Sequence, residues 1–387
     1  MNNFTFYSPT YFVFGRDTEA LSGEYVKKFG GTNVLIHYGG ESAKKSGLLD
    51  RVTASLSALN ISYTLLGGVV PNPLSGLVYE GISIVKEKNI DFILAVGGGS
   101  VIDSAKAIAL GGKYDGDFWD FYSGKATFSD AVPVGTVLTI PAAGSEGSGD
   151  SVITHENGNL KRFTGGDALR PRFSILNPEL TKTLPKNQIA YGVCDIMAHV
   201  FERYFSNTKN CEVTTSLCES LLKTLISEAP KAISGGFDYD SMANIIWAGM
   251  VAHNNIVGVG RDQDWSSHVI EHELSSLYGI AHGAGLAVVF PGWMKFVYKH
   301  DLDLFARFAK NVFSITEEDK EKAALLAIES LQKFWKSIGL PSNFSELGAK
   351  EEDIPTLAEN IGLEGGMLGA FVPLSQKDAE SVLKLCL

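Results

Sequence analysis

The sequence predicts an α/β domain followed by an all-helical domain. In the first half of the 387 residues, short apolar runs that end in glycine alternate with stretches of helical spacing. Beyond Leu184 the apolar runs stop and helical stretches follow one another. Repeats of strand, glycine turn and helix are typical of βαβ units with a mostly parallel sheet. We therefore place the domains at residues 1–184 and 185–387, with a cleft between them in which ligands bind.

Four strands are expected in the first domain, each a short run of apolar and β-branched residues. Glycines follow the first three of these runs directly. The stretches between them have helical spacing, and one helix is expected to open at Ser100. The expected strands cover residues 33–38, 61–66, 92–96 and 132–140.

The second domain is expected to contain helices only. Its helical stretches cover residues 187–205, 214–229, 241–257, 266–278 and 317–338. Thr316 is a candidate N-cap for the last stretch, because acidic residues fill the turn that follows it.

Charge and composition exclude several classes of protein. Lys and Arg number 33 against 44 Asp and Glu, a net charge of −11, and no stretch is densely basic. We therefore expect no nucleic-acid or membrane partner. The first residues lack the pattern of a signal peptide, and no apolar run reaches the roughly 18 residues that span a bilayer. The scattered Cys194, Cys211, Cys218 and Cys386 suggest free thiols in a reducing cytoplasm.

The glycine turn at residues 97–99 lies between a buried strand and a helix. Glycines let the backbone approach a phosphate, and the N–H groups of the helix N-terminus attract negative charge. Ser100 can cap the helix or bind a phosphate oxygen. A plain tight turn is the alternative, but the Gly39–Gly40 pair and the small-residue loop 139–146 follow neighbouring strands. Three such loops at one sheet edge predict a site for an extended nucleotide.

The first of these loops bears on the choice of cofactor. NAD sites usually place an acidic residue near the adenine ribose, but here Gly39 follows the strand. This leaves room for a 2′-phosphate, which Ser42 with Lys44 or Lys45 could bind. Glu41 argues against it, because its carboxylate would repel the phosphate. On balance the loop favours NADP(H) over NAD(H).

Two pairs of residues in the helical half have the spacing of a metal site. Asp195 and His199 are four residues apart, as are His268 and His272, so each pair lies on one face of a helix. His282 follows closely, and the chain has only 8 His. One carboxylate with several imidazoles suits a divalent ion such as Fe²⁺ or Zn²⁺. Spacing alone leaves open which four of the five bind, and solvated histidines are the alternative.

Four separated segments resemble the motifs of the iron-containing alcohol dehydrogenase family. They follow one another in the expected order, and the resemblance as a whole extends over nearly the entire chain. The Tyr38–Gly47 loop is most similar to the butanol dehydrogenase branch, which includes NADPH-dependent aldehyde reductases. In place of that branch's third glycine stands Glu41. The four segments are residues 97–103, 139–146, 195–199 and 265–287.

The resemblance implies a Rossmann-like domain and an all-helical domain, an architecture shared with dehydroquinate synthase. It implies a homodimer, a metal held by Asp195, His199, His268 and His282, and a catalytic role for His272 near the nicotinamide. Cofactor contacts are implied at Gly39, Ser42, Gly98, Gly99, Ser100, Asp103, Thr139 and Lys161.

The expected activity is hydride transfer between NAD(P)H and a small aldehyde or primary alcohol. The metal, Fe²⁺ in preference to Zn²⁺, acts on the substrate oxygen as a Lewis acid, and His272 relays a proton. Polyol oxidation like that of glycerol dehydrogenase is an alternative. A lyase like dehydroquinate synthase would need basic residues beside the metal, and none lies between His268 and Leu286. A non-enzymatic binding module is the remaining possibility.

Overall fold

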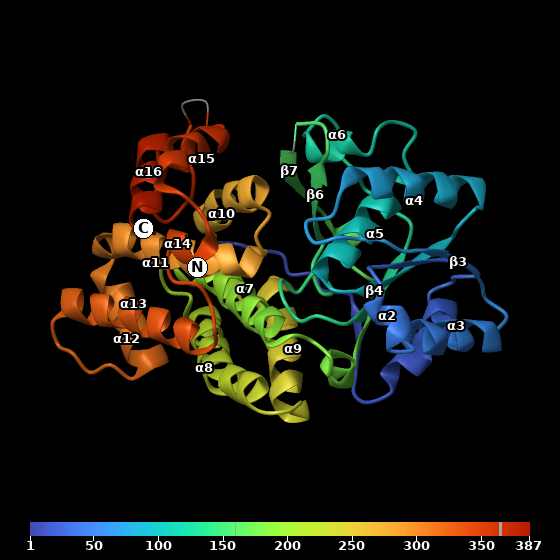
Figure 1. Cartoon of the computed structure of the whole chain (residues 1–387), viewed down its shortest axis with the longest axis horizontal. Coiled ribbons are helices and arrows are strands. Elements are labelled where there is room, and N and C mark those ends of the chain that lie inside the picture. Colours follow the sequence, from blue (N-terminus) through green and yellow to red (C-terminus); the bar gives the residue numbers. More distant parts are fainter. Residues whose placement is uncertain (159, 364–365) are drawn as a thin grey trace. The chain divides into compact units, whose positions relative to one another are not determined.

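The structure is a computed structural model that describes residues 1–158, 160–363 and 366–387 (Figure 1). Its contacts divide the chain into two units. One is Tyr7–Leu184, and the other joins Met1–Phe6 to Pro185–Leu387.

The first six residues are part of the helical unit, whereas we expected them in the α/β domain. The amino group of Met1 donates a hydrogen bond of 2.7 Å to the carbonyl of Lys209. The N–H of Asn2 donates one of 2.8 Å to the carbonyl of Gly260. These bonds explain why the segment groups with residues far along the chain.

Tyr7–Leu184 contains a parallel sheet of six strands in the order β1-β8-β5-β4-β2-β3. The four expected strands are β2 to β5, and the two strands that we did not predict, β1 and β8, are only four residues long. The prediction of an α/β domain is confirmed. The strands are β1 (Tyr11–Phe14), β2 (Asn33–Tyr38), β3 (Ser62–Leu66), β4 (Phe92–Gly97), β5 (Val134–Leu138) and β8 (Phe173–Leu176).

Both faces of the sheet are covered by helices (Figure 1). On one face, Val34 and Ile36 of β2 pack against apolar residues of α1 and α3. The alternate residues, such as Leu35 and Ile93, are also fully buried, and α5 packs on β4 and β5. The helices are α1 (Ser22–Lys28), α2 (Ser42–Lys45), α3 (Leu48–Ala58), α4 (Ser75–Glu87), α5 (Gly99–Gly111) and α6 (Trp119–Tyr122), with 3₁₀ turns at Thr18–Leu21, Asp167–Leu169 and Pro178–Thr181.

A separate antiparallel hairpin, which we did not predict, joins β6 (Asp150–His155) to β7 (Leu160–Gly165). It packs on α4, α5 and α6. Polar residues alternate irregularly with apolar ones along both strands, so the period-2 signal of a strand is weak here.

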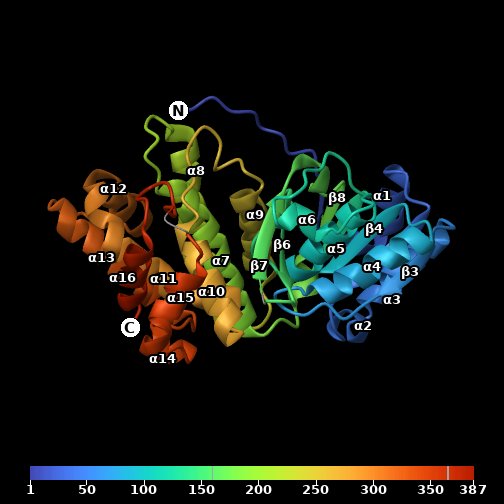
Figure 2. The ribbon, with the colours of Figure 1, turned by 90° about the horizontal axis from the view of Figure 1, so that it is seen from above.

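The second unit is helical, which confirms that part of the predicted fold. Helix α7 packs against α8, α9 and α11, and Figure 2 shows α7 and α8 side by side. Among the described residues, no helix combines the length and the apolar character that a membrane crossing requires. The helices are α7 (Lys186–Tyr204), α8 (Glu212–Ser234), α9 (Tyr239–His253), α10 (Ser266–Tyr278), α11 (His282–Val297), α12 (Leu302–Phe313), α13 (Lys320–Ser337), α14 (Phe344–Leu347), α15 (Ile354–Asn360) and α16 (Gln376–Lys384), with 3₁₀ turns at Tyr298–His300 and Glu351–Asp353.

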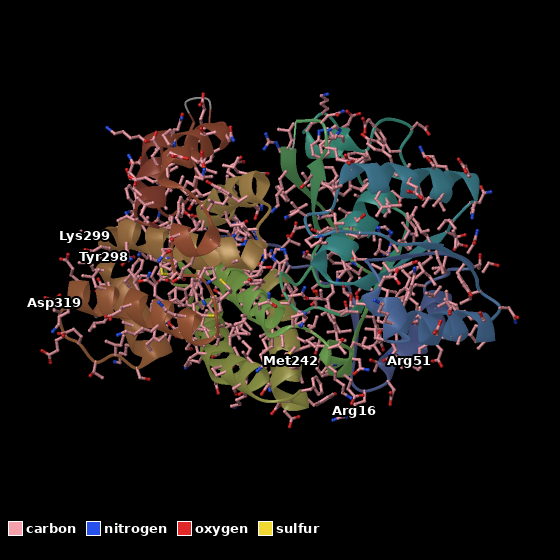
Figure 3. The ribbon with its side chains drawn as sticks, viewed as in Figure 1. Arg16, Arg51, Met242, Tyr298, Lys299 and Asp319 are labelled. Atoms are coloured by element: carbon pink, nitrogen blue, oxygen red, sulfur yellow. The ribbon has the colours of Figure 1, made fainter. Side chains whose placement is uncertain are left out.

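Helix α13 begins three residues later than expected, and Thr316 is not its cap. Asp319 caps the helix by accepting a hydrogen bond of 3.0 Å from the N–H of Lys322. Tyr298 and Lys299, adjacent in Figure 3, both bind the carboxylate of Glu321 in the first turn. The sequence predicted an earlier start because acidic residues, which are favourable in the first turn of a helix, also lie directly ahead of it.

Candidate active site

Helix α7 carries the first pair of predicted metal ligands. Asp195 and His199 lie one turn apart on a helix that is buried for most of its length, and each side chain is only 7% exposed. The Oδ1 atom of Asp195 lies 3.5 Å from Nε2 of His199. A carboxylate in this position is removed from water and needs a positive partner.

Two further imidazoles from other helices point at the same oxygen. Asp195 Oδ1 lies 3.9 Å from Nε2 of His268 on α10 and 3.8 Å from Nε2 of His282 at the start of α11. Ligand atoms of Asp195, His268 and His282 all lie within 4.8 Å of one another, and His199 joins them through Asp195. Four ligands about 2.1 Å from a tetrahedral metal would be about 3.4 Å apart, close to these separations.

Carboxylates behind two of the imidazoles fix which nitrogen carries the proton. Glu202 accepts a hydrogen bond of 2.7 Å from Nδ1 of His268, and Glu271 accepts one from Nδ1 of His282. Because Nδ1 donates to a carboxylate, Nε2 is the nitrogen of each ring that faces Asp195.

This arrangement fits a divalent cation. Within the described part of the chain, Asp195 Oδ1 and His268 Nε2 are buried without a hydrogen-bond partner. Lone pairs that face one another repel, and a cation between them turns the repulsion into coordination. One carboxylate with three imidazoles suits a borderline ion such as Fe²⁺ or Zn²⁺.

Burial also keeps the groups around α7 in the protonation states that this role requires. Burial, reinforced by the nearby His253, holds the pKa of His199 well below its usual range, so this imidazole is neutral. Burial raises the pKa of Cys194 well above its usual range, so this neighbouring thiol is not ionised.

Glu202, about one turn beyond His199 on α7, connects α7 to the start of α10. Besides His268 Nδ1, it accepts hydrogen bonds from the N–H of Trp265 at 2.8 Å and from that of His268 at 3.1 Å. Trp265 has φ +68°, a value that few residues other than glycine adopt, and the guanidinium of Arg203 lies 4.7 Å from its ring. The carboxylate thus fixes both the ring of His268 and the backbone that carries it.

The sequence pattern did not point to Arg203 or His253. The His253 ring centroid lies 4.1 Å from that of His199, and Nη2 of Arg203 lies 3.1 Å from Nδ1 of His253. Arg203 also donates to the carbonyl of His199. The signal for Arg203 was its position four residues after His199, but His253 reaches the site only because α9 packs on α7.

Two glycines at the start of α11 make room for the site. A Cβ on Gly283 would overlap the carbonyl of Tyr191, and a Cβ on Gly285 would overlap the carboxylate of Glu271. Small residues here let α11 approach α7 and let Glu271 lie beneath His282. The glycines of the His282–Gly285 motif therefore have a steric role.

His272, the predicted catalytic residue, lies on α10 one turn beyond His268. Its ring centroid is 5.5 Å from that of His282, and it is half-buried. It also shares a second group of close ligand atoms with Glu271 and His282. Glu271 already binds Nδ1 of His282, so the Asp195 group is the better candidate for a metal site, with His272 beside it.

In the α/β unit, three of the predicted cofactor loops lie at one sheet edge. Tyr38 of β2 pairs with Val96 of β4, and Gly97 pairs with Leu138 of β5, so the strand ends are aligned. Gly39, Gly98 and Thr139 follow these three ends. Ligands of open parallel sheets bind outside the carboxyl ends of the strands.

Gly98, Gly99 and Ser100 form the turn that opens α5. The helix begins at Gly99, one residue earlier than expected, with Gly98 as its cap residue in an extended conformation. A Cβ on Gly99 would meet no atom within 4 Å, so that side of the turn is open to a ligand. The N–H groups of the first turn have no partners within the helix and can bind phosphate oxygens.

The loop after β2 places Ser42 at the start of the short helix α2. Glu41 precedes it and forms an ion pair of 3.2 Å with Lys44. Both side chains are exposed. The pair occupies Lys44, one of the two lysines that we expected to be available for a 2′-phosphate.

Asp103 and Lys161, the other two predicted cofactor contacts, do not lie in the loops at the strand ends. The carboxylate of Asp103 accepts hydrogen bonds from Ser145 Oγ at 2.6 Å and from the N–H of Val152 at 3.0 Å. Lys161 lies on β7, paired with Thr154 of β6. Asp103 therefore supports the segment that follows β5.

The comparisons with known proteins agree along the whole chain. The family model described as iron-containing alcohol dehydrogenase matches residues 9–178, and the model of the C-terminal domain of that family matches residues 189–387. A probable NADH-dependent butanol dehydrogenase of Bacillus subtilis is 43% identical over 100% of both chains. An NADPH-dependent aldehyde reductase of Escherichia coli is 34% identical over 94% of both. The crystal structure of an NADH-dependent butanol dehydrogenase A from Thermotoga maritima matches with a TM-score of 0.97 and 40% identity, over 100% of this chain and 99% of that one.

Proposed function

Because the chain belongs to the iron-containing alcohol dehydrogenase family, we propose that it transfers a hydride between NAD(P)H and a small aldehyde or the corresponding primary alcohol. The observation that carries the proposal is the convergence of three imidazole nitrogens on Asp195 Oδ1. The names of similar proteins, which include butanol dehydrogenases and an aldehyde reductase, support a small alcohol or aldehyde as substrate.

We propose Asp195, His199, His268 and His282 as the metal ligands. When bound, the metal supplies Lewis acidity for the oxygen of the substrate. Glu202 and Glu271 keep the protons on Nδ1 of the two histidines that they bind, so the Nε2 atoms stay available as ligands. The ligand set suits both Fe²⁺ and Zn²⁺, and the family supports Fe²⁺ as the first choice.

His272 is the proposed proton relay. It is half-buried, one turn from His268, and is not needed as a ligand. Imidazole titrates near neutral pH, so its ring can give a proton to an alkoxide oxygen during reduction and take one back during oxidation.

For the cofactor we propose contacts at Gly39, Ser42, Gly98, Gly99, Ser100 and Thr139. These residues follow the aligned ends of β2, β4 and β5. Asp103 and Lys161 also remain proposed cofactor contacts, and Asp103 in addition supports the segment that follows β5. We propose that NADP(H) is favoured over NAD(H), because Gly39 leaves room for the 2′-phosphate. Glu41 weakens this preference, because its carboxylate repels the phosphate and pairs with Lys44.

We further propose that the protein works as a homodimer in the cytoplasm. The family resemblance supports the dimer. The four buried cysteines without disulfides agree with a reducing compartment.

The test is elemental analysis of the purified protein combined with turnover of an aldehyde series with NADPH and with NADH. We expect about one equivalent of metal per chain and reduction of short aldehydes. In His268→Ala we expect metal content and turnover to be lost together, whereas His272→Ala should keep the metal and turn over more slowly. Full activity of His268→Ala without bound metal would refute the metal assignment.

A further inference from the structure

The loop between β5 and β6 is held by hydrogen bonds at every carbonyl from Ser145 to Asp150. Three of these oxygens accept from one buried side chain, that of Lys106 on α5. Its Nζ lies 2.8 Å from the carbonyl of Ser145, 3.0 Å from that of Ser148 and 2.7 Å from that of Asp150. The remaining three accept from the Oγ of Ser174, the Nη1 of Arg170 and the N–H of Gly166.

Lys106 is fully buried, and these bonds help to compensate its ammonium group for the loss of water. Nζ also bonds the hydroxyl of Ser145 at 2.8 Å, and that hydroxyl donates to Asp103. Burial lowers the pKa of Lys106 to about 8, while Asp103 and Asp150 oppose the shift, so the ammonium is still the main form at neutral pH. A buried cation without a catalytic task is costly, so its position requires a reason.

The other end of the same loop touches the glycine turn. The side chain of Ile140 packs against Gly98 so closely that a Cβ atom on Gly98 would lie only 3.0 Å from it. The N–H of Thr139 donates a hydrogen bond to the carbonyl of Gly97. The segment 139–150 is therefore fixed to α5 twice. Its first residues lie against the turn at the start of the helix, and its last residues bind Lys106 two turns along.

We propose that Lys106 is a positioning residue for the nicotinamide half of the cofactor, an inference that rests on the proposed function. The sheet order places the loop after β5 on the opposite side of the glycine turn from the loop after β2. A dinucleotide with its adenosine at Gly39 and its pyrophosphate at the turn extends its second half over residues 139–144. Lys106 binds the residues that directly follow this segment, from Ser145 to Asp150, and so fixes its far end without touching the cofactor.

The experiment compares binding of two probes by titration calorimetry, without substrate. The probes are ADP, which reaches only the β2 loop and the glycine turn, and NADH or NADPH, whichever the wild type binds more tightly. In Lys106→Met we expect the dissociation constant of the dinucleotide to rise about tenfold or more while that of ADP changes less than about twofold. Ser145→Ala, which removes one contact of Nζ, should show a smaller change in the same direction.

The matched control is Ile108→Ala, because Ile108 is a buried residue of the same helix whose side chain lies against Gly81 of α4. It should lower the melting temperature and leave the ratio of the two dissociation constants unchanged. Equal loss of ADP and dinucleotide affinity in Lys106→Met, or a selective loss in Ile108→Ala, would overturn the inference. If Lys106→Met does not fold, the same criteria apply to Ser145→Ala and Lys106→Gln.

The outcomes also separate this inference from the proposed function. A wild-type protein that binds the dinucleotide but reduces no aldehyde contradicts the function and leaves the comparison of probes valid. If the wild type reduces aldehydes but Lys106→Met and Ser145→Ala bind the dinucleotide as tightly as the wild type, the proposed function stands. Only the role of Lys106 is then contradicted.

Discussion

A single atom, Oδ1 of Asp195, brings together imidazoles from three helices. Two of them have a carboxylate behind Nδ1, so Glu202 and Glu271 determine which ring nitrogen donates and leave Nε2 facing Asp195. The spacing of Asp195, His199 and His268 could be read from the sequence. The geometry of the supporting carboxylates could not, because it depends on how α7, α10 and α11 pack.

The role of Glu202 leads to a prediction about metal affinity. Glu202→Gln removes the negative charge that holds the proton on His268 Nδ1, so metal affinity should fall about 10- to 100-fold. Competition with a chelator measures it. Glu219→Gln is the control, because Glu219 is also a buried acid of the helical unit but binds Tyr204 and Arg307. Equal losses in the two variants would assign the effect to general destabilisation.

Glu41 leads to a prediction about cofactor choice. Glu41→Gln removes a charge near the expected 2′-phosphate and releases Lys44, so KM for NADPH should fall about fivefold, which corresponds to about 1 kcal/mol between exposed charges. KM for NADH should stay nearly constant. Adding Lys44→Ala to this variant should reverse the gain. An equal change of both KM values would show that Glu41 does not discriminate between them.

His37 predicts a pH dependence of stability. It is fully buried on β2, donates from Nδ1 to the carbonyl of Leu66 and accepts from Ser104 Oγ. Burial lowers its pKa to about 4. Between pH 4 and 6.5 the unfolded chain therefore binds more protons, so the free energy of unfolding should rise with pH across this window, by on the order of 3 kcal/mol from this residue.

Denaturant unfolding of wild type and His37→Asn at several pH values checks this. The difference between the two proteins isolates His37, because the other titrating groups are common to both. The advantage of the wild type should shrink as the pH falls from 6.5 to 4. Parallel pH profiles would contradict the prediction.

Elements differed in how well the sequence predicted them. Strands β2 and β4 and helix α10 have clear periodicity or apolar runs, and their predicted bounds agree closely with the structure. Helix α11 was missed because it contains Gly283, Gly285 and, further along, Pro291, which signal breaks in a local reading. Tertiary packing overrides those signals, because α11 is buried against α7, α10 and α16.

The close contact between Gly283 and α7 leads to a prediction about the position of helix α11. In Gly283→Ala the new methyl group overlaps the carbonyl of Tyr191, so α11 should move away from α7, at a cost of about 1–3 kcal/mol. His282 moves with it, and metal content should fall. Ala287→Gly is the control, since it weakens the same helix by about 1 kcal/mol without a clash. Loss of metal in both variants would remove the steric explanation.

At the scale of the whole molecule, the two candidate sites lie in different units of the chain. The proposed metal ligands are all in Pro185–Leu387, and the cofactor loops are all in Tyr7–Leu184. The division was predictable from the change of pattern near Leu184. The place of Met1–Phe6 was not, because it depends on hydrogen bonds to residues more than 200 positions away.

This separation predicts selective effects of ligands on stability. A chelator should lower the thermal stability of the helical unit, and NAD(P)H should raise that of the α/β unit, because each ligand stabilises the fold that binds it. Calorimetry, with proteolysis to assign each transition, measures both effects. A chelator that lowers only the transition of the α/β unit would contradict the metal assignment.

The return of the first six residues to the helical unit also has a consequence for synthesis on the ribosome. Tyr7–Leu184 is complete when less than half of the chain has been translated, and domains generally fold as units from the N-terminus. The partners of Met1 and Asn2, at Lys209 and Gly260, emerge only later. The segment Met1–Phe6 therefore has neither of these partners while Tyr7–Leu184 folds, and it can bind the helical unit in full only after residue 260 has emerged.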